Sequence, residues 1–386
     1  MEKQIGQRYE MLQYTNVEDL LKKMVADFRQ DMKSLGHVNI IIAGKTGVGK
    51  STLINAAFRE RLAKTGMGKP VTQQCRRIEK DGIPIRIYDT VGLELNEARK
   101  QETISEIHNL IQEKIQAGNA DEFIHCVWYC VQSDSDRFEE AEQEFVRRIA
   151  EECDVPVILV ITKSYLKKHA KEFASEIKSY NLPVKSICTV LAEAYEDEDF
   201  SAKPYGVPEL VERTLDVLPD SARRAWVNAQ RASLDIKREE ARAIIKQTVS
   251  MAFGAGYNPL PVSDTLVLAP IQISMFIRIT NVYGIHMTKG LAASIASSLL
   301  GIAGATVVGR TVVSNLLKII PGLGTVIGGT ISGATAAMLT WGLGRTYIQI
   351  MEKLFTGELK VEDLEKESVK ETIKEFLKNN MKKKEE

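Results

Sequence analysis

The chain has 386 residues, too many for one ordinary domain, so we expect two or three domains. Lysine plus arginine and aspartate plus glutamate both total 51, which gives a formal net charge of zero. A chain without a global basic field is poorly suited to hold RNA or DNA, and this disfavours nucleic acid as a partner. The five cysteines lack metal-type spacing and the N-terminus lacks an apolar signal core, so we expect a reducing, cytoplasmic location.

The first half of the chain alternates between apolar and charged runs. Residues 1–36 have the apolar periodicity of an amphipathic helix. After them, strand-like runs are expected at 38–42, 83–88, 123–131, 155–161 and 184–190. Helix-like charged runs separate or follow these strands, at 95–117, 136–152, 165–179 and 207–217. This alternation predicts an α/β domain with a mostly parallel sheet, covered by helices on both faces, that binds its ligand at the carboxyl ends of the strands.

A glycine-rich motif follows the first strand-like run. Residues 44–51 match the pattern G-x-x-x-x-G-K-S/T, and a helix-like run follows them. In this strand–loop–helix setting, backbone N–H groups surround phosphate oxygens, the lysine reaches the β- and γ-phosphates, and the serine hydroxyl binds Mg²⁺. The alternative is a glycine-rich turn that arose by chance, but such a turn would not need a strand before it and a helix after it. The residues expected to bind the nucleotide are Gly44, Lys45, Thr46, Gly47, Val48, Gly49, Lys50, Ser51 and Thr52, with Lys50 also catalytic and Ser51 also a metal ligand.

Two further elements are expected to complete the phosphate site. Asp89 follows the strand-like run 83–88 and can hold Mg²⁺ through water, while the N–H group of Gly92 can contact the γ-phosphate. We also predict that Thr72 is a switch threonine, whose hydroxyl completes the Mg²⁺ shell and supports catalysis. Spacing alone does not separate Thr72 from Thr65, and a strand-edge threonine without a ligand is the simpler alternative.

The composition changes in the second half of the chain. A charged helical connector at 219–247 is followed by two charge-free runs, 290–309 and 319–344, that are rich in Gly, Ala, Ser and Thr. Both runs are long enough to cross the ~30 Å hydrocarbon layer of a bilayer. Their small and hydroxylated residues also suit closely packed helices in a water-soluble domain. We favour a buried or reversibly inserting helical domain over a permanent transmembrane hairpin.

The order of the first-half motifs resembles that of an Era/TrmE-like small GTPase. GKTGVGKS, KPVT, DTVG and ITKS follow one another at 44–51, 69–72, 89–92 and 161–164. The resemblance implies a P-loop GTPase fold, GTP or GDP with Mg²⁺ as ligands, and hydrolysis of GTP to GDP and phosphate. It also implies that Thr162 and Lys163 contact the guanine base, and that a backbone amide at Ala192 meets the guanine oxygen.

Two departures from the family pattern concern the base and the attacking water. Tyr165 occupies the position of the family's aspartate, which binds guanine N1 and N2. Leu93 occupies the position of the glutamine that orients water in Ras-like relatives, and leucine cannot form a hydrogen bond through its side chain. We therefore predict slow intrinsic hydrolysis that a partner or self-association accelerates. Arg137 is a speculative arginine donor, and a solvated surface arginine is the alternative.

The second half of the chain resembles a helical YcjF-type domain of unknown function (DUF697) over residues 243–350. The stretches that carry this resemblance are 257–261, 269–272 and 320–325. The combined architecture is similar to that of immunity-related and dynamin-like GTPases, and relatives are often membrane-associated. The resemblance implies a membrane surface or membrane protein as partner, a homodimer through the G domain, and a peripheral or integral association with the inner membrane as alternatives to a purely cytoplasmic protein.

We therefore expect four parts: an N-terminal helical segment (1–36), a P-loop GTPase or G domain (37–218), an all-α Gly/Ala-rich domain with an apolar hairpin (219–356), and a charged C-terminal helix (357–386). The leading hypothesis is a nucleotide-dependent switch coupled to a helical domain that binds a membrane or a partner. A ribosome-assembly or RNA-modifying GTPase is the first alternative, and a nucleotide-binding scaffold with negligible hydrolysis is the second. Single-turnover hydrolysis distinguishes this second alternative from the switch.

Overall fold

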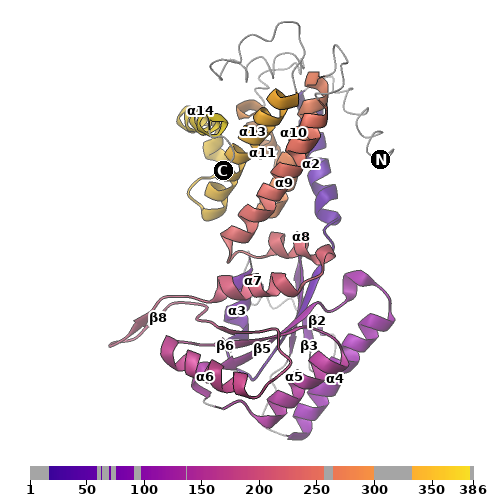
Figure 1. The fold of residues 1–386 in the computed structure, drawn as a ribbon, viewed down its shortest axis with the longest axis vertical. Helices are drawn as coiled ribbons and strands as arrows, with labels where there is room; N and C mark the ends of the chain where they lie inside the picture. The colour runs from indigo at the N-terminus through magenta and orange to yellow at the C-terminus, as the bar shows by residue number, and fades with distance from the viewer. Residues whose placement is uncertain are drawn as a thin grey trace. The chain divides into compact units, whose positions relative to one another are not determined.

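The computed structural model describes residues 17–58, 62, 69–70, 75–90, 97–135, 137–255, 264–299 and 333–382 (Figure 1). The chain divides into two compact units. One runs from Leu35 to Ile236, and we call it the α/β unit. The other combines the chain up to Ser34 with the chain from Lys237 onward, and we call it the helical unit. The helical unit is therefore built from both ends of the chain.

A seven-stranded sheet forms the centre of the α/β unit, with the strand order β2-β3-β4-β1-β5-β6-β7. The strands are β1 (Val38–Ala43), β2 (Lys69–Pro70), β3 (Cys75–Lys80), β4 (Ile83–Thr90), β5 (Cys126–Gln132), β6 (Val157–Thr162) and β7 (Ser186–Thr189). Pairing is parallel from β4 to β7, whereas β2, β3 and β4 pair antiparallel. The predicted α/β fold with a mostly parallel sheet is confirmed. Strand β3 was not predicted, because its run of charged residues does not resemble a buried strand.

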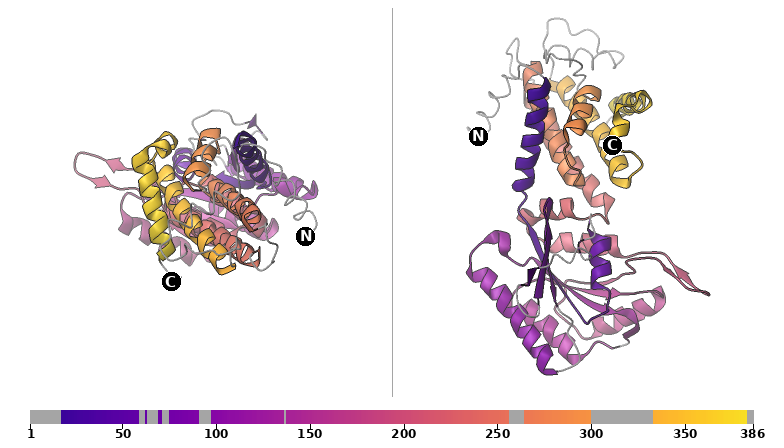
Figure 2. Two further views of the ribbon diagram at one scale, coloured as in Figure 1. Left: turned by 90° about the horizontal axis from the view of Figure 1, so that it is seen from above. Right: turned by 180° about the vertical axis from the view of Figure 1, so that it is seen from behind.

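Helices cover both faces of this sheet (Figures 1 and 2). Apolar residues of α4 (Glu97–Gln116), α5 (Glu140–Glu152) and α6 (Lys167–Ser179) share one buried cluster with Val127 and Tyr129 of β5. Trp128 lies between these two residues, so it points to the opposite face. There it contacts α3 (Lys50–Ala57), α7 (Val207–Val217) and α8 (Asp220–Ala229) through Phe58 next to α3, Thr214 and Trp226.

Helix α8 belongs to the α/β unit, which extends beyond the sequence-based limit at 218. The Trp226 ring packs edge-on against Phe58, with ring centroids 5.5 Å apart, and the indole N–H donates to the Val211 carbonyl oxygen at 3.0 Å. The Arg231 N–H donates to the Ala57 carbonyl oxygen at 2.8 Å. The buried face of α8 is difficult to recognise in the charged sequence of residues 219–247, because it consists of only a few apolar residues, all of which are buried.

The helical unit joins the N-terminal helix to the C-terminal helices. Its elements are α2 (Val17–Lys33), α9 (Leu234–Ala255), α10 (Asp264–Tyr283), α11 (Lys289–Ser298), α13 (Gly333–Thr356), the 3-10 turn η4 (Val361–Glu365) and α14 (Glu367–Lys382). Helix α10 packs against both α2 and α13, and α13 packs against α14. Helix α2 is thus an integral part of this unit, although the sequence pattern shows it only as a separate amphipathic segment.

Small residues on α13 allow its neighbours to approach closely. A Cβ atom on Gly344 would lie 2.7 Å from Cγ1 of Ile245 on α9, and one on Gly342 would lie 2.6 Å from Cγ of Met381 on α14. Larger side chains at these glycines would therefore push the helices apart. Among the helices of the described residues, none has both the length and the apolarity needed to cross a bilayer. Residues 300–332, which include parts of both charge-free runs, lie outside the described residues.

Candidate functional site

The glycine-rich loop lies at the carboxyl end of β1, immediately before α3. Gly44, Gly47 and Gly49 have φ angles of 139°, 79° and 98°, which L-residues with side chains rarely adopt. At Gly44, a Cβ atom would also lie 2.2 Å from the carbonyl oxygen of Cys130 on β5. Both the backbone conformation and the lack of space for a side chain therefore require glycine at position 44. The loop leads into the N-terminus of α3, whose unpaired N–H groups and dipole favour an anion.

Lys50 is the first residue of α3, and its side chain folds back over the loop. Its ammonium group donates to the carbonyl oxygens of Gly44 at 2.8 Å and Lys45 at 3.2 Å. The loop is also tied to β6, because the Thr162 hydroxyl donates to the Val48 carbonyl oxygen at 2.5 Å. The Lys45 ammonium pairs with Glu139 at 2.7 Å instead of facing the loop. Lys50 is thus the lysine that this geometry offers to a phosphate group.

Asp89 lies next to the loop, because it pairs in register with Ile42 on β1. Its Oδ1 atom is buried, and no described residue forms a hydrogen bond with it. Burial raises the pKa of this carboxyl group, while the Lys50 and Arg76 charges oppose that rise. A buried carboxylate oxygen without a protein donor suits an oxygen-seeking cation such as Mg²⁺. Asp89 and the exposed Ser51 would hold this cation, which would neutralise charge on the phosphates.

The predicted residues Thr72 and Gly92, together with Thr65 and Leu93, lie outside the described residues. Their roles stay predictions. Arg137 is described and is exposed just before α5, and its role also stays a prediction. All five cysteines are buried and unpaired, as expected for a chain without disulfides.

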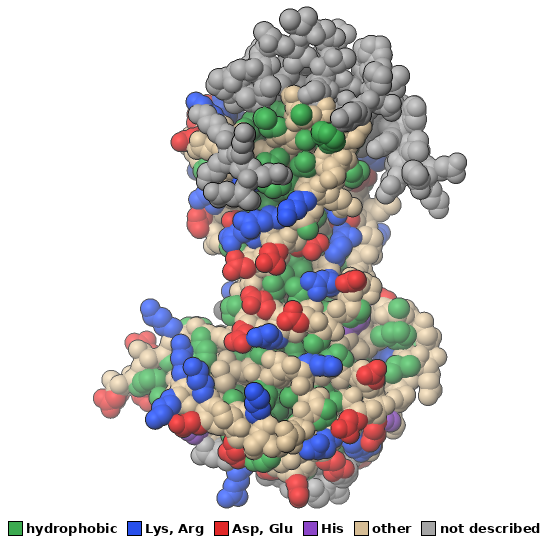
Figure 3. Space-filling view, in the orientation of Figure 1, with side chains coloured by type: hydrophobic (Ala, Val, Ile, Leu, Met, Phe, Trp, Pro, Cys, Tyr) green, Lys and Arg blue, Asp and Glu red, His purple; other side chains and the backbone are tan. Residues whose placement is uncertain are grey.

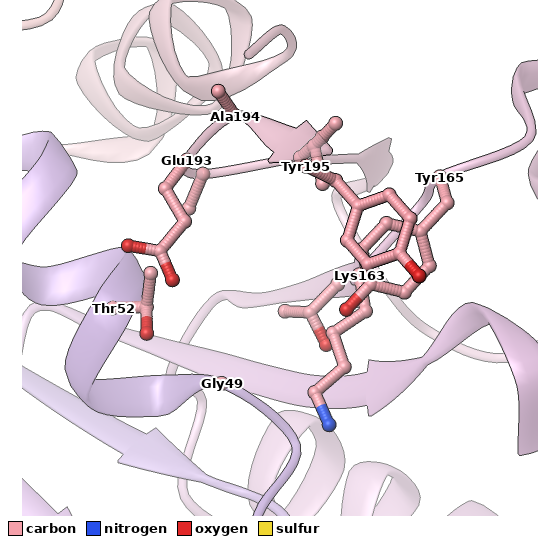
Figure 4. A pocket seen from close by; sticks show the side chains of 10 residues that line it. Gly49, Thr52, Lys163, Tyr165, Glu193, Ala194 and Tyr195 are labelled. Carbon is pink, nitrogen blue, oxygen red and sulfur yellow. The ribbon is translucent and has the colours of Figure 1, made fainter. Parts of the chain in front are cut away.

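A second part of the site is a pocket beside the loop, at the carboxyl ends of β6 and β7 (Figure 4). The residues that line it are Gly49, Thr52, Thr162, Lys163, Tyr165, Leu191, Ala192, Glu193, Ala194 and Tyr195. It therefore brings together five residues of the predicted nucleotide set: Gly49, Thr52, Thr162, Lys163 and Ala192. Their contact with a base stays a prediction. The long side chain of Lys163 and the rings of Tyr165 and Tyr195 offer apolar surface to a planar ligand.

Five lining residues were not among the predicted nucleotide contacts: Tyr165, Leu191, Glu193, Ala194 and Tyr195. The rings of Tyr165 and Tyr195 have centroids only 4.4 Å apart. Tyr195 begins a short hairpin formed by β8 (Tyr195–Glu196) and β9 (Ser201–Ala202). Two-residue strands leave almost no periodic signal in a sequence, so these contacts could not be located from the pattern.

Comparison with known proteins decides the class of this site. Residues 39–163 match the family described as "50S ribosome-binding GTPase", and residues 221–382 match the "Domain of unknown function (DUF697)". The chain therefore contains a GTPase domain, followed by a DUF697 domain. The predicted combination of a GTPase domain with a DUF697 domain is confirmed.

Curated relatives match parts of this GTPase. Magnetosome membrane protein 22 of Magnetospirillum gryphiswaldense is 29% identical over 112 residues, which cover 29% of this chain and 57% of that protein. Translocase of chloroplast 108 of Physcomitrium patens is 45% identical over 56 residues, which cover 14% of this chain and 6% of that protein. Septin-9 of Rattus norvegicus is 24% identical over 170 residues, which cover 38% of this chain and 29% of that protein. The chain thus spans less than two thirds of each.

Among solved structures, similarity extends to a probable GTP-binding protein engB. That structure is 20% identical, with a TM-score of 0.33, and the match covers 47% of this chain and 98% of the other. Toc33 from Arabidopsis thaliana is 16% identical with a TM-score of 0.31, and covers 57% of this chain and 97% of the other.

Replacing Asp89 with asparagine tests the proposed metal contact. Asparagine keeps the shape of the side chain but removes its negative charge, so Mg²⁺ should add much less to the affinity for GTP. We expect the apparent affinity for Mg²⁺ to fall about 10- to 100-fold. Titration of MgCl₂ against a fluorescent GTP analogue measures this change. Asp81→Asn, in the exposed turn between β3 and β4, is the control. An unchanged Mg²⁺ titration in Asp89→Asn would exclude the contact.

Proposed function

We propose that this GTPase is a nucleotide-dependent switch whose helical unit binds a membrane surface or a membrane protein. The observation that carries this proposal is that the helical unit is made from both ends of the chain. Helix α2 ends at Lys33, shortly before β1, and β1 leads directly into the phosphate loop. On the other side, α9 begins at Leu234 and continues into the helical unit. Two covalent connections thus join the nucleotide site to the helices.

The geometry of the phosphate site supports a response to the γ-phosphate. The phosphate oxygens of a triphosphate would compete with the carbonyl oxygens of Gly44 and Lys45 for the Lys50 ammonium group. Ligand binding would therefore rearrange the segment that joins β1 to α3, and hydrolysis would reverse the change. Leu93 supplies no hydrogen bond to the attacking water, so we propose slow hydrolysis that a partner or a second copy of the G domain accelerates.

Two observations support a membrane-associated partner. The matched relatives include a protein named for the magnetosome membrane and a protein named as a chloroplast translocase. The helical unit also carries large apolar side chains that stay exposed, with Met251 44%, Phe253 42% and Met338 45% accessible. We propose reversible, peripheral association of an otherwise cytoplasmic protein.

Liposome flotation tests this function. The full chain is mixed with vesicles of phosphatidylethanolamine and phosphatidylglycerol, in the presence of a non-hydrolysable GTP analogue, GDP or no nucleotide. We expect flotation mainly with the analogue, and we expect Lys50→Ala to lose it. Flotation that is equal in all three states would contradict a switch, and a lack of flotation in every state would contradict a lipid partner.

A second candidate function is ribosome binding, which the description of the family matched at residues 39–163 favours. A protein that binds ribosomal RNA ordinarily uses a basic surface. The net charge of the chain is zero, and basic and acidic side chains are interspersed on the face shown in Figure 3. We therefore place this candidate second. Nucleotide-dependent cosedimentation with 50S particles at moderate salt would reverse that order.

A further inference from the structure

The pocket beside the phosphate loop is lined by one acidic side chain. The family position for a base-binding aspartate is occupied by Tyr165, yet the pocket still contains one carboxylate, that of Glu193. We propose that Glu193 recognises the guanine base in place of the missing aspartate. This inference deepens the GTP-binding function and rests on nucleotide binding in this pocket.

The position of Glu193 is determined by a set of backbone hydrogen bonds. The Val190 N–H donates to the Ile161 carbonyl oxygen at 2.7 Å, and the Ser164 N–H donates to the Val190 carbonyl oxygen at 3.2 Å. Leu191 and Tyr205 exchange two further bonds of 3.0 Å each. These contacts hold the segment that carries Glu193 against the carboxyl end of β6, next to the Thr162-Lys163 loop.

The same region is held from its other end by Gly206. With a φ of 82°, Gly206 has a conformation that favours glycine, and a Cβ atom there would lie 2.0 Å from the Thr189 carbonyl oxygen. The Tyr205 hydroxyl donates to the Ser164 carbonyl oxygen at 2.8 Å. Both ends of the irregular segment from residue 190 to residue 206 are therefore attached to the end of β6 and to the loop that follows it. This attachment explains how an irregular segment can present a side chain at a reproducible place.

Tyr165 is unsuited to the role of the missing aspartate. Its ring lies against the ring of Tyr195, with centroids 4.4 Å apart and the planes inclined by 48°. A phenol also offers one oxygen, where the carboxylate it replaces offers two. In Figure 4 the two tyrosines and Lys163 lie on one side of the pocket, whereas Glu193 and Thr52 lie on the opposite side. The tyrosines form one wall of the pocket, and the Glu193 side chain lies on the opposite wall, where it points toward Thr52.

The chemistry of Glu193 matches guanine better than other purines. Guanine presents adjacent N1–H and N2–H donors, and an ionised carboxylate has two oxygens that accept such a pair. Xanthine has a carbonyl oxygen in place of the N2 amino group, and adenine has an acceptor at N1, so both would meet the carboxylate with a repulsive lone pair. Within the described part of the chain, the Glu193 carboxylate makes no hydrogen bond or ion pair, and it is therefore available to a ligand.

Glu193→Gln in the full chain tests this assignment. The carboxamide keeps one acceptor for N1–H and gains a donor that suits the C2 oxygen of xanthine. Charge-assisted hydrogen bonds are stronger than neutral ones, so we expect GDP affinity to fall about 10- to 100-fold. XDP affinity should rise or stay level, which lowers the GDP-over-XDP preference by at least the same factor. Competition of GDP, XDP and ADP against a fluorescent GDP derivative measures all three affinities.

Glu196→Gln is the matched control. Glu196 is exposed on β8, close in sequence to Glu193, and it is not among the residues that line the pocket. This control should keep the parent's affinities and its preference for GDP. If Glu193→Gln kept the parent's GDP affinity and GDP-over-XDP preference, the assignment would be overturned while guanine-nucleotide binding stood. If the parent chain itself bound none of the three nucleotides, the nucleotide-binding function would fail, and this inference with it.

Discussion

Replacing Lys50 with alanine is expected to lower both GTP affinity and the rate of GTP hydrolysis by about 100-fold or more. The lysine ammonium is the positive charge that the loop geometry offers to the β- and γ-phosphates. A charge-assisted hydrogen bond contributes roughly 1.5–3 kcal/mol, and loss of one transition-state donor costs about 10²–10³ in rate. Fluorescent-nucleotide titration measures the affinity, and single-turnover phosphate release measures the rate.

Lys45→Ala gives a graded comparison within the same loop. The Lys45 ammonium is 2.7 Å from Glu139, so it is already engaged with α5. Its removal should therefore cost less than about 10-fold in GTP affinity, since a partly exposed ion pair contributes about 1 kcal/mol or less. Equal losses in the two variants would mean that general positive charge, and not the placement of Lys50, determines phosphate binding.

The phosphate loop could be predicted from the sequence because its residues have few substitutes. Positive φ angles and the close approach of Gly44 to the Cys130 carbonyl oxygen require glycine. The residue types of the loop therefore indicate its backbone geometry. The apolar strand before the loop and the helix after it give independent local signals. For these reasons the predicted loop, β1 and α3 correspond to the structure within a few residues.

The base pocket and the helical unit could be predicted only in part. Glu193 and Tyr195 reach the pocket through an irregular excursion, whose position depends on hydrogen bonds to residues far away in the sequence. Likewise, nothing in the periodicity of α2 shows that it packs against α10, because an amphipathic pattern identifies an apolar face but not its partner. Local patterns therefore predicted the elements, and long-range contacts determined their assembly.

Trp226→Ala is expected to lower the free energy of unfolding of the α/β unit by about 3–5 kcal/mol, the usual cost of removing a large buried aromatic side chain. Trp226 is 0% exposed, and its ring lies 5.5 Å from Phe58 and 5.9 Å from Trp128 between ring centroids. The substitution would leave a cavity between α8 and the sheet and would remove the hydrogen bond to the Val211 carbonyl oxygen. Hydrogen exchange of the β5 amides reports on this unit specifically.

The control for this prediction is Trp341→Ala, which alters the helical unit through α13. Exchange of the β5 amides should be faster in Trp226→Ala and should match the parent in Trp341→Ala. This comparison also tests where the GTPase domain ends. If Trp226→Ala left β5 exchange unchanged, α8 would be energetically separable from the sheet, and the limit at 218 would be the better boundary. A strong acceleration would mean that α8 stabilises β5, which lies beside β1 in the sheet. The GTPase domain would then need the chain through Ile236.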